Sequence, residues 1–562
     1  MNQTIKPPSF RLPLEADDIQ VNTCTNPYCN SFGKKPINGN KIEKLERDKH
    51  FVIVGINGVN KKGEVIKSRG VKCKNCGVIS SVHSNYACAE ELKRFLSSRA
   101  KAISCRNKDC ENNGVLLQAN SSQYRKFGKS QSGSIRYRCK SCLSTFSISS
   151  NSNHRLRKPE KTIEILKLLV NKVPMRRICE VADVSPSLVY QRIDRIYDVF
   201  SKYSEHEKSI FSNLGAEFLH LCSDSQDITL NWDTSLDRRI TVLKSFATAE
   251  AKSGFIVAQH VNFDPNIDPI ELELEARELG DPELQLSYRR YARIWMPSDF
   301  RGESEGTEEN KISKVFANGA MVRQIYTQYG HFLYLQKILN SIPELQFSLD
   351  PDPGIGRAVL YSFREKVIKN TLQVCLVKIQ KDLTLSEKKT LLANSDEFWE
   401  EEQRKQPSLS EVQLLEHIIE RQLLEESYQS LKPSKRWIDS PLPNINEPYK
   451  QIQLISYDDE GQSKKALWAI ARASLRSVDR YFMLVRRRLS LFERPIHSSS
   501  STNRAWHGYQ AYNPYTTVKL LEIFRIVYNY HLAGTTKQTP AQKLGITDRP
   551  LSLDELIKGV TL

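Results

Sequence analysis

The sequence predicts a multidomain α/β protein in which two small cysteine-rich modules and an all-α three-helix unit precede a strand-rich core with a helical insertion. Three observations predict this fold class. Two cysteine quartets with the same spacing lie in the first 150 residues, apolar residues at helical spacing follow over 155–200, and alternating apolar residues mark strands over 215–385. A chain of 562 residues is long enough for about three or four domains.

The balance of charge points to a polyanionic partner. Lys and Arg number 82 against 65 Asp and Glu, a net charge of +17, which favours nucleic acid over a membrane surface. No apolar run approaches the roughly 20 residues of a membrane span, and the first residues lack the apolar centre of a signal peptide. We therefore expect a cytoplasmic, nucleoid-associated protein in a reducing compartment, where its 12 cysteines are better interpreted as metal ligands than as disulfides.

The cysteines form two quartets of identical order. Each quartet has a C-x4-C pair followed by a C-x2-C pair, and the residues around the second pair match as VKCKNC (71–76) and YRCKSC (137–142). This pattern indicates an internal duplication, with a first zinc-ribbon module over 1–95 and a second over 96–152. Four thiolates complete a tetrahedral zinc site with no open position, so we expect two structural zinc ions. The predicted ligands are Cys24, Cys29, Cys73 and Cys76 in the first site and Cys105, Cys110, Cys139 and Cys142 in the second.

Residues 153–205 have the pattern of a helix-turn-helix DNA-binding domain. Pro159 is a good first-turn residue, and apolar residues from Ile163 to Leu169 at helical spacing predict a first helix. A second short helix is expected over 175–181, and Ser185 followed by Pro186 begins a third helix that reaches Phe200. Polar residues early in that helix are placed to reach base edges, and arginines to reach phosphates. A three-helix packing unit without DNA contact is the alternative. The side chains expected to face DNA are Ser187, Tyr190, Gln191, Arg192 and Arg195.

Residues 215–385 form the first part of the predicted core. Strands are expected over 228–232, 240–243 and 255–257, a helix over 322–339, and two further strands over 345–349 and 372–379. The first strand ends at Asp233. The fourth ends at Asp350, where a Pro- and Gly-rich stretch stops it. A carboxylate at the end of a buried strand is well placed to hold a divalent cation.

Two further segments complete the predicted chain. Residues 386–440 are rich in Glu, Gln, Lys and Leu, which predicts a helical insertion with a solvated acidic face. Residues 441–562 hold a strand near 452–456 and a long helix over 464–492, followed by a C-terminal tail. Apolar residues spaced three and four apart form the buried stripe of that helix, and Asp479 lies beside the stripe.

Several stretches resemble bacterial insertion-element proteins. Residues 136–146 (RYRCKSCLSTF) resemble an R-Y-x-C-x-x-C-x-x-T-aromatic stretch in a small zinc-ribbon and helix-turn-helix protein that recognises element ends. The order of strands and helix over 215–385 resembles the ribonuclease-H-like core of DDE-type transposases and integrases. Residues 478–489 resemble the last catalytic helix of those enzymes, and the tail carries similar Y-N-P and T-P-A-x-x-L-G sequences.

The resemblance implies a DNA transposase that binds insertion-element ends and performs metal-dependent 3′-end nicking and strand transfer. Its catalytic acids would be Asp233, Asp350 and Asp479, holding two Mg²⁺ or Mn²⁺ ions, and it would act on double-stranded DNA as a homo-oligomer. The third acid of the family is usually Glu, whereas Asp479 is one methylene shorter.

More than one residue could fill each catalytic role, and more than one function is possible. Asp237 or Asp227 could serve as the first acid, Asp352 as the second, and Glu493 or Glu460 as the third. A catalytically inactive, transposase-derived DNA-binding regulator is one alternative function, and a metal-dependent DNA nuclease is another.

Overall fold

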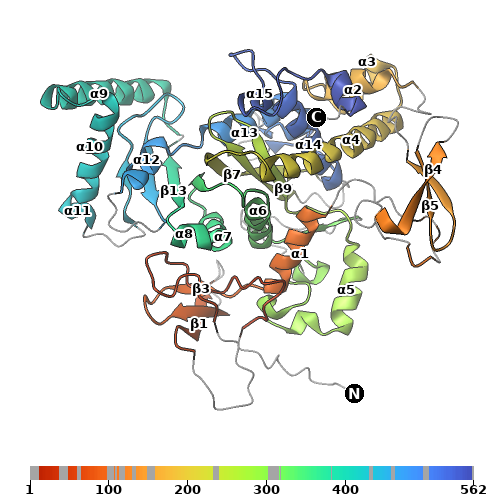
Figure 1. Ribbon diagram of the computed structural model, residues 1–562, viewed down its shortest axis with the longest axis horizontal. Helices are drawn as coiled ribbons and strands as arrows, with labels where there is room; N and C mark the ends of the chain where they lie inside the picture. The colour runs from red at the N-terminus through yellow and green to blue at the C-terminus, as the bar shows by residue number, and fades with distance from the viewer. Residues whose placement is uncertain are drawn as a thin grey trace. The chain divides into compact units, whose positions relative to one another are not determined.

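A computed structural model describes most of the chain (Figure 1). The described residues are 12–36, 48–59, 65–97, 105, 107, 110–112, 121–129, 135–148, 158–231, 240–300, 316, 318–380, 382–429, 435–456, 463–497 and 505–559. Contacts divide the chain into two compact units: unit 1 contains Met1–Phe95 and Ser212–Met483, and unit 2 contains Leu96–Phe211 and Leu484–Leu562. No helix in these described ranges is long and apolar enough to cross a membrane.

Unit 1 is built on a seven-stranded mixed sheet. Strand β8 is antiparallel to both of its neighbours, β7 and β9, whereas β12 and β13 run parallel to β7, and β15 is antiparallel to β13. The order across the sheet is β14-β15-β13-β12-β7-β8-β9. The strands are β7 (Phe218–Leu230), β8 (Thr241–Glu250), β9 (Ile256–Val261), β12 (Glu344–Leu349), β13 (Leu372–Ile379), β14 (Ile438–Asp439) and β15 (Lys450–Leu454).

Helices cover both faces of this sheet. On one face, His331 of α6 (Gln324–Ile338) hydrogen-bonds to Thr248 of β8, with 2.8 Å between His Nε2 and Thr Oγ1. Thr248 pairs with Ser223 of β7. On the other face, the backbone N–H of Ser474, between α12 (Lys464–Arg472) and α13 (Arg476–Arg488), donates to Ser348 Oγ at 3.3 Å. Ser348 pairs with Cys222, one residue from Ser223, so the two sets of helices lie on opposite faces.

The strands and helices match the sequence expectation in part. The predicted fourth and fifth strands and the helix before them are confirmed as β12, β13 and α6. The first strand is longer than predicted, since β7 begins at Phe218. Strand β8 is also longer than predicted, and it continues to Glu250 through residues that were expected to form a connection. The helix expected over 464–492 is broken into α12 and α13, because the buried carboxylate of Glu447 accepts hydrogen bonds from Ser474 Oγ (2.7 Å) and Leu475 N (3.0 Å).

Unit 1 also contains the first cysteine-rich module and the helical insertion. The module consists of β1 (Phe51–Val59), β2 (Val65–Cys73), β3 (Ile79–Ser81) and α1 (Asn85–Leu96). Helix α1 directly follows the three-stranded sheet. The insertion is helical as predicted, with α9 (Leu385–Lys405), α10 (Glu411–Leu424) and α11 (Glu426–Gln429). A short helix α7 (Pro353–Ser362) follows β12, and α5 (Pro269–Glu278) follows β9.

Unit 2 contains the second cysteine-rich module, three consecutive helices and the C-terminal tail. The module has strands β4 (Tyr124–Lys129), β5 (Ile135–Cys139) and β6 (Thr145–Ile148). The three helices are α2 (Lys161–Leu169), α3 (Met175–Ala182) and α4 (Pro186–Ser212), and the tail holds α14 (Pro514–Tyr530), α15 (Pro540–Lys543) and α16 (Leu553–Lys558). Together the units confirm a multidomain α/β protein. The domain boundaries predicted from the sequence stay predictions, since one compact unit can hold several domains.

Candidate metal centres and nucleic-acid interface

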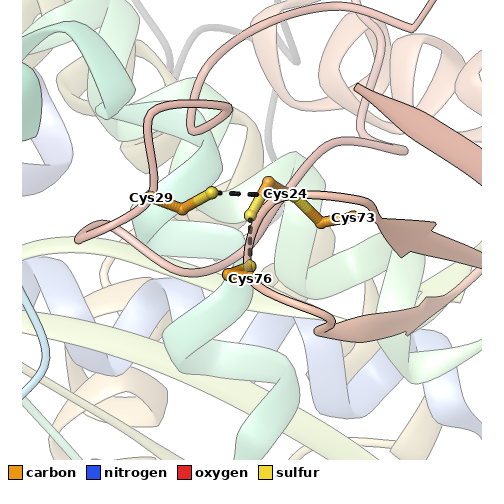
Figure 2. A group of neighbouring side chains, drawn as sticks. All are labelled: Cys24, Cys29, Cys73 and Cys76. Atoms are coloured by element: carbon orange, nitrogen blue, oxygen red, sulfur yellow. Dashed lines mark hydrogen bonds between the residues drawn. The ribbon is translucent and has the colours of Figure 1, made fainter. Parts of the chain in front are cut away.

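The first cysteine quartet assembles at the end of β2. Cys73 is the last residue of β2, Cys76 lies in the turn that follows, and Cys24 and Cys29 come from the chain before the ribbon. The Sγ atoms are 3.5 Å apart for Cys24 and Cys76 and 3.6 Å apart for Cys29 and Cys73. Figure 2 shows the four side chains directed toward a common centre.

The second quartet repeats this arrangement. The Sγ atoms of Cys105 and Cys142 are 3.3 Å apart, and those of Cys110 and Cys139 are 3.8 Å apart. In each quartet the four sulfur atoms lie within 4.8 Å of one another, and three of the four residues are buried. The two groups therefore share both ligand order and geometry, as the sequence duplication predicted.

Both quartets fit a zinc ion. A tetrahedral site with Zn–S bonds of about 2.3 Å separates its sulfur atoms by about 3.8 Å, close to the spacings within each quartet. A disulfide would bring two sulfur atoms to about 2.05 Å, and all these cysteines are free thiols. Since four thiolates fill the coordination sphere, a bound zinc ion would be structural rather than catalytic.

The thiols do not titrate alike. Burial would raise the pKa of Cys73, but backbone N–H groups of Cys76 and Asn75 lower it to about 7. The hydroxyl of Ser144 lowers the pKa of Cys142 to about 6, whereas burial raises the pKa of Cys105 to about 11. At least one thiol in each quartet therefore loses its proton more readily than a free cysteine, and a metal ion must displace the protons that remain.

This titration predicts that zinc retention depends on pH. Below about pH 6, Cys73 and Cys142 are protonated in the metal-free protein, and zinc must displace additional protons. We expect the apparent zinc affinity to fall about tenfold per pH unit for each added proton. Competition with a chromophoric chelator at pH 7.5, 6.5 and 5.5 would measure this fall, and a constant affinity over that range would contradict it.

Three of the side chains that the sequence predicts to face DNA are exposed at the start of α4. Asp183 adopts a left-handed conformation (φ 50°) that ends α3, and α4 begins three residues later. Ser187, Tyr190 and Gln191 are exposed as predicted, and Tyr190 is 47% exposed. These three residues remain the candidates for contact with base edges.

The predicted outward position of Arg192 is wrong. Its side chain is only 2% exposed, and Nη2 lies 3.5 Å from the carbonyl oxygen of Lys158 ahead of α2. Arg192 is buried because it directly precedes the buried Ile193 and so lies at the edge of the helix face that packs inward. Arg195, three residues later, lies at the same edge. Arg195 is half-buried, so neither arginine presents a fully exposed guanidinium.

The second cysteine-rich module carries a basic face. Arg125 on β4 lies directly opposite Arg138 on β5, so both side chains are on the same side of the ribbon. Phe127, 42% exposed, lies on that side too, and the guanidinium carbons of Arg136 and Arg138 lie 5.6 and 5.3 Å from its ring centre. Like charges opposite each other cost stability, a cost that a polyanionic partner would remove.

Asp350 lies where β12 meets β7. Its backbone N–H donates to the carbonyl oxygen of Ser223 at 3.2 Å, so the parallel pairing continues one residue beyond β12. The next residue of β7 is Asp224, a buried acid, 9% exposed, that the sequence reasoning missed. Asp233, the predicted first acid, lies outside the described residues, and so does Asp237.

Asp352 and Asp227, which the sequence also allows as catalytic acids, have structural partners. Both carboxylate oxygens of Asp352 accept hydrogen bonds, from Gly354 N (2.7 Å) at the start of α7 and from Gln324 Nε2 (3.1 Å) of α6. This carboxylate is therefore the N-cap of α7. Asp227 forms an ion pair with Lys244 and, being an odd number of residues from Asp224, points to the opposite face of β7.

Asp479 lies on the helix that covers the Asp224 face of the sheet. Tyr481 OH of α13 donates to Gln259 Oε1 at 2.6 Å, and Gln259 pairs with Ala247, which in turn pairs with Asp224. Burial raises the pKa of the Cys222 thiol, and the nearby carboxylates of Glu250, Glu447 and Asp479 raise it further. Asp479 is thus close to the face that carries Cys222 and Asp224.

The two glutamates that could replace Asp479 as the third acid differ in their setting. Glu493 belongs to unit 2, where its carboxylate lies 3.0 Å from Lys172 Nζ, and Glu460 lies outside the described residues. Among described residues, the cysteine quartets are the groups of three or more ligands within 4.8 Å, so Asp224, Asp350 and Asp479 do not share one ligand cluster of that size. Three carboxylates that divide two ions between them do not need to meet at one point.

Comparison with known proteins adds no identification. No protein-family model matches the chain, and no curated protein matches it.

Proposed function

We propose that this protein is a DNA transposase of the DDE type, with a ribonuclease-H-like core in unit 1 and DNA-recognition elements in unit 2. The observation that carries the proposal is the adjacency of two acids, Asp224 on β7 and Asp350 at the end of β12, on a sheet whose face is covered by the helix that bears Asp479. Three acids with this placement suit a two-metal phosphodiester reaction.

The order of the sheet supports the inference about the core. Three antiparallel strands are followed by a helix and then by two strands parallel to the first, which lie on its other side in the order β9-β8-β7-β12-β13. This is the order expected of the ribonuclease-H-like core that the sequence resembles. A fold alone does not imply an activity, so the proposal depends on the acids as well.

The chain's own residues have distinct tasks in this proposal. Bound Mg²⁺ or Mn²⁺ would activate water or a 3′-hydroxyl and stabilise the leaving oxygen. Asp224 and Asp350 supply oxygen ligands from adjacent strands, whose register fixes the spacing of their backbones. Asp479 supplies a third carboxylate from α13, which Tyr481 ties to β9. Hard carboxylate oxygens suit these ions better than thiolates or imidazoles would.

Two surfaces of unit 2 support a role in DNA binding. The exposed start of α4 offers Ser187, Tyr190 and Gln191 for base contact, and the second zinc module offers Arg125, Arg136 and Arg138 for phosphates. Phosphate contacts give affinity without sequence information, and base contacts select the sequence. Unit 2 would therefore recognise the element end.

The helix-turn-helix assignment gives a prediction that separates two neighbouring residues. Gln191→Ala should weaken binding to the DNA that flanks the gene by about 1–3 kcal/mol and reduce sequence preference, because its exposed side chain is placed to contact bases. Arg192→Ala should instead lower stability, because its buried side chain is part of the packing. Mobility-shift titrations with specific and scrambled DNA, beside thermal unfolding, would measure both effects. Equal binding by Gln191→Ala and the wild type would contradict the assignment.

A strand-transfer assay tests the function directly. Purified protein is mixed with labelled DNA from the gene's flanks, a plasmid target and Mg²⁺ or Mn²⁺, and joined products are resolved on a gel. Joined product supports the transposase, and cleavage without joining supports a nuclease. Binding without cleavage in either metal supports a regulator, a function that the short side chain of Asp479 favours.

A further inference from the structure

We infer that the first zinc module is a positioning element for the loop that carries Asp350, whereas the second is a DNA-facing module. The inference rests on the proposed function for the role of Asp350. It assigns different tasks to two copies of one metal-binding unit, and it places a structural zinc ion in the support of the core.

The first module is locked to its own helix by a buried polar network. Asn22, two residues before the ligand Cys24, donates to the carbonyl oxygen of His83 at 2.9 Å and accepts from the backbone N–H of His83 at 2.8 Å. Asn85 at the start of α1 accepts from the N–H of Val21 at 2.9 Å. Because Cys24 is one of the four ligands, a zinc ion that fixes the quartet also fixes the chain that holds residues 83–85.

The same segment contacts the two helices on either side of the Asp350 loop. Ser84 N donates to Tyr326 OH of α6 at 3.3 Å, and Gln20 N donates to Tyr361 OH of α7 at 2.8 Å. Burial and the charge of Arg357 on α7 lower the pKa of His83 to about 3, so its neutral ring can accept from Arg357 Nη1 at 3.3 Å.

Helix α1 packs on α6 at very short range. A Cβ added at Gly330 of α6 would lie 2.7 Å from Glu91 Cγ and 2.9 Å from Phe95 Cε2, so only glycine permits this approach. Glu91 is fully buried and accepts hydrogen bonds from Thr327 of α6 (3.3 Å) and from Arg293 (3.2 Å). A buried carboxylate with these partners is costly to move, so the α1–α6 contact is rigid.

Helices α6 and α7 in turn hold the loop after β12. Gln324 and Gln328 of α6 donate to the carboxylate of Asp352 at 3.1 and 3.3 Å, and that carboxylate caps α7. Asp352 N also donates to the carbonyl oxygen of Asp350 at 2.8 Å. A continuous set of contacts therefore runs from the Cys24 loop, through α6 and α7, to Asp350.

The second module has diverged on its outer face. In the first module the strand that begins at Phe51 reads FVIVGINGV and has no charged residue, whereas its counterpart from Tyr124 reads YRKFGK and has three. Phe51 and Tyr124 occupy equivalent positions, because each pairs with the first cysteine of its C-x2-C pair. The module with the apolar strand belongs to unit 1, which contains the seven-stranded sheet. The module with the basic strand belongs to unit 2, where it precedes the helix-turn-helix.

Equivalent ligand substitutions test the assignment in the full-length protein. Cys76→Ser and Cys142→Ser remove corresponding ligands from the first and second sites. In each variant, the rate of backbone hydrogen exchange over residues 350–362 and the amount of bound zinc are both measured. We expect about tenfold faster exchange in Cys76→Ser and no change in Cys142→Ser, while binding of flanking DNA is retained in the first variant and weakened in the second. Loss of zinc from the first site with unchanged exchange over 350–362 would overturn the inference.

A second variant keeps both zinc sites. Thr327→Val with Tyr361→Phe removes two hydrogen bonds between the module and the core, and Thr390→Val with Tyr449→Phe is a control that removes three hydrogen bonds in and beside the insertion. Only the first pair should speed exchange over 350–362, and it should lower the rate of joining without changing the DNA concentration for half-maximal rate. Identical exchange in the two pairs would refute the inference. Hydrogen exchange is measured without DNA, so it tests the inference even if the wild-type protein shows no strand transfer.

Discussion

Asp224→Asn and Asp350→Asn should each abolish strand transfer while DNA binding is retained. Each substitution replaces a carboxylate that the proposed mechanism assigns as a metal ligand by an amide of the same shape. Loss of several kcal/mol of transition-state stabilisation corresponds to about a thousandfold or more in rate. The gel-based joining assay measures the loss, and mobility shifts measure binding.

Two controls make this test specific. Asp227→Asn changes an acid on the same strand that faces the other side of the sheet and pairs with Lys244, so joining should change no more than a few fold. Asp233→Asn tests the acid that the sequence suggested. If Asp233→Asn loses activity and Asp224→Asn keeps it, the first acid is Asp233 and the assignment to Asp224 is wrong.

The two variants should also differ from ordinary core substitutions in stability. Asp224 and Asp350 are like charges on neighbouring residues of paired strands, so they repel each other in the metal-free protein. Removing one charge should leave the melting temperature unchanged or raise it. In the proposed active site, two acids that lie close together lower the stability of the fold, because the reaction requires both of them.

Arg525→Met should destabilise unit 2 by about 3–5 kcal/mol, because it leaves two buried carboxylates without their partner. The guanidinium of Arg525 on α14 lies 2.7 Å from Glu207 of α4 and 2.9 Å from Glu522, and each of the three residues is less than 5% exposed. Tyr530 OH also donates to Glu207 at 2.9 Å. The cluster joins the long helix α4 to the C-terminal tail.

Thermal unfolding of the full chain measures this effect. For a unit of this size, the expected loss corresponds to a fall of roughly 10 °C in the unfolding transition of unit 2. Arg549→Met is a matched control in the same unit, because its ion pair with Glu555 is exposed and its loss should change the stability little. A shift no larger for Arg525→Met than for this control would contradict a structural role for the cluster.

The sequence predicted features that depend on local patterns. The cysteine spacings identified both quartets, because four ligands on two short loops leave little freedom in where the chain can go. Strand β13 was predicted with its observed bounds, since it is apolar on both faces and lies inside the sheet. In these elements the local pattern and the tertiary environment agree.

The features that the sequence did not reveal depend on distant contacts. The first half of β7 places His220, Cys222 and Asp224 on a buried face, where His220 Nε2 lies 2.8 Å from Ser348 Oγ of the neighbouring strand. Polar residues that find partners only across the sheet obscure the alternation that marks a strand. The break between α12 and α13 has the same origin, because Glu447 lies 27 residues before the Ser474 hydroxyl that it accepts from.

The small core of each cysteine-rich module explains how the two copies can differ so much on their surfaces. Each small core consists of the cysteines with a few aromatic and aliphatic side chains around them, and a zinc ion bound by the four sulfur atoms would hold it together. Apart from core residues such as Phe51 and Tyr124, the outer strand of each module carries side chains outside this core, so mutation can exchange an apolar surface for a charged one without loss of the scaffold. Duplication of such a unit supplies a chain with a spare surface whose chemistry can drift until a new contact retains it.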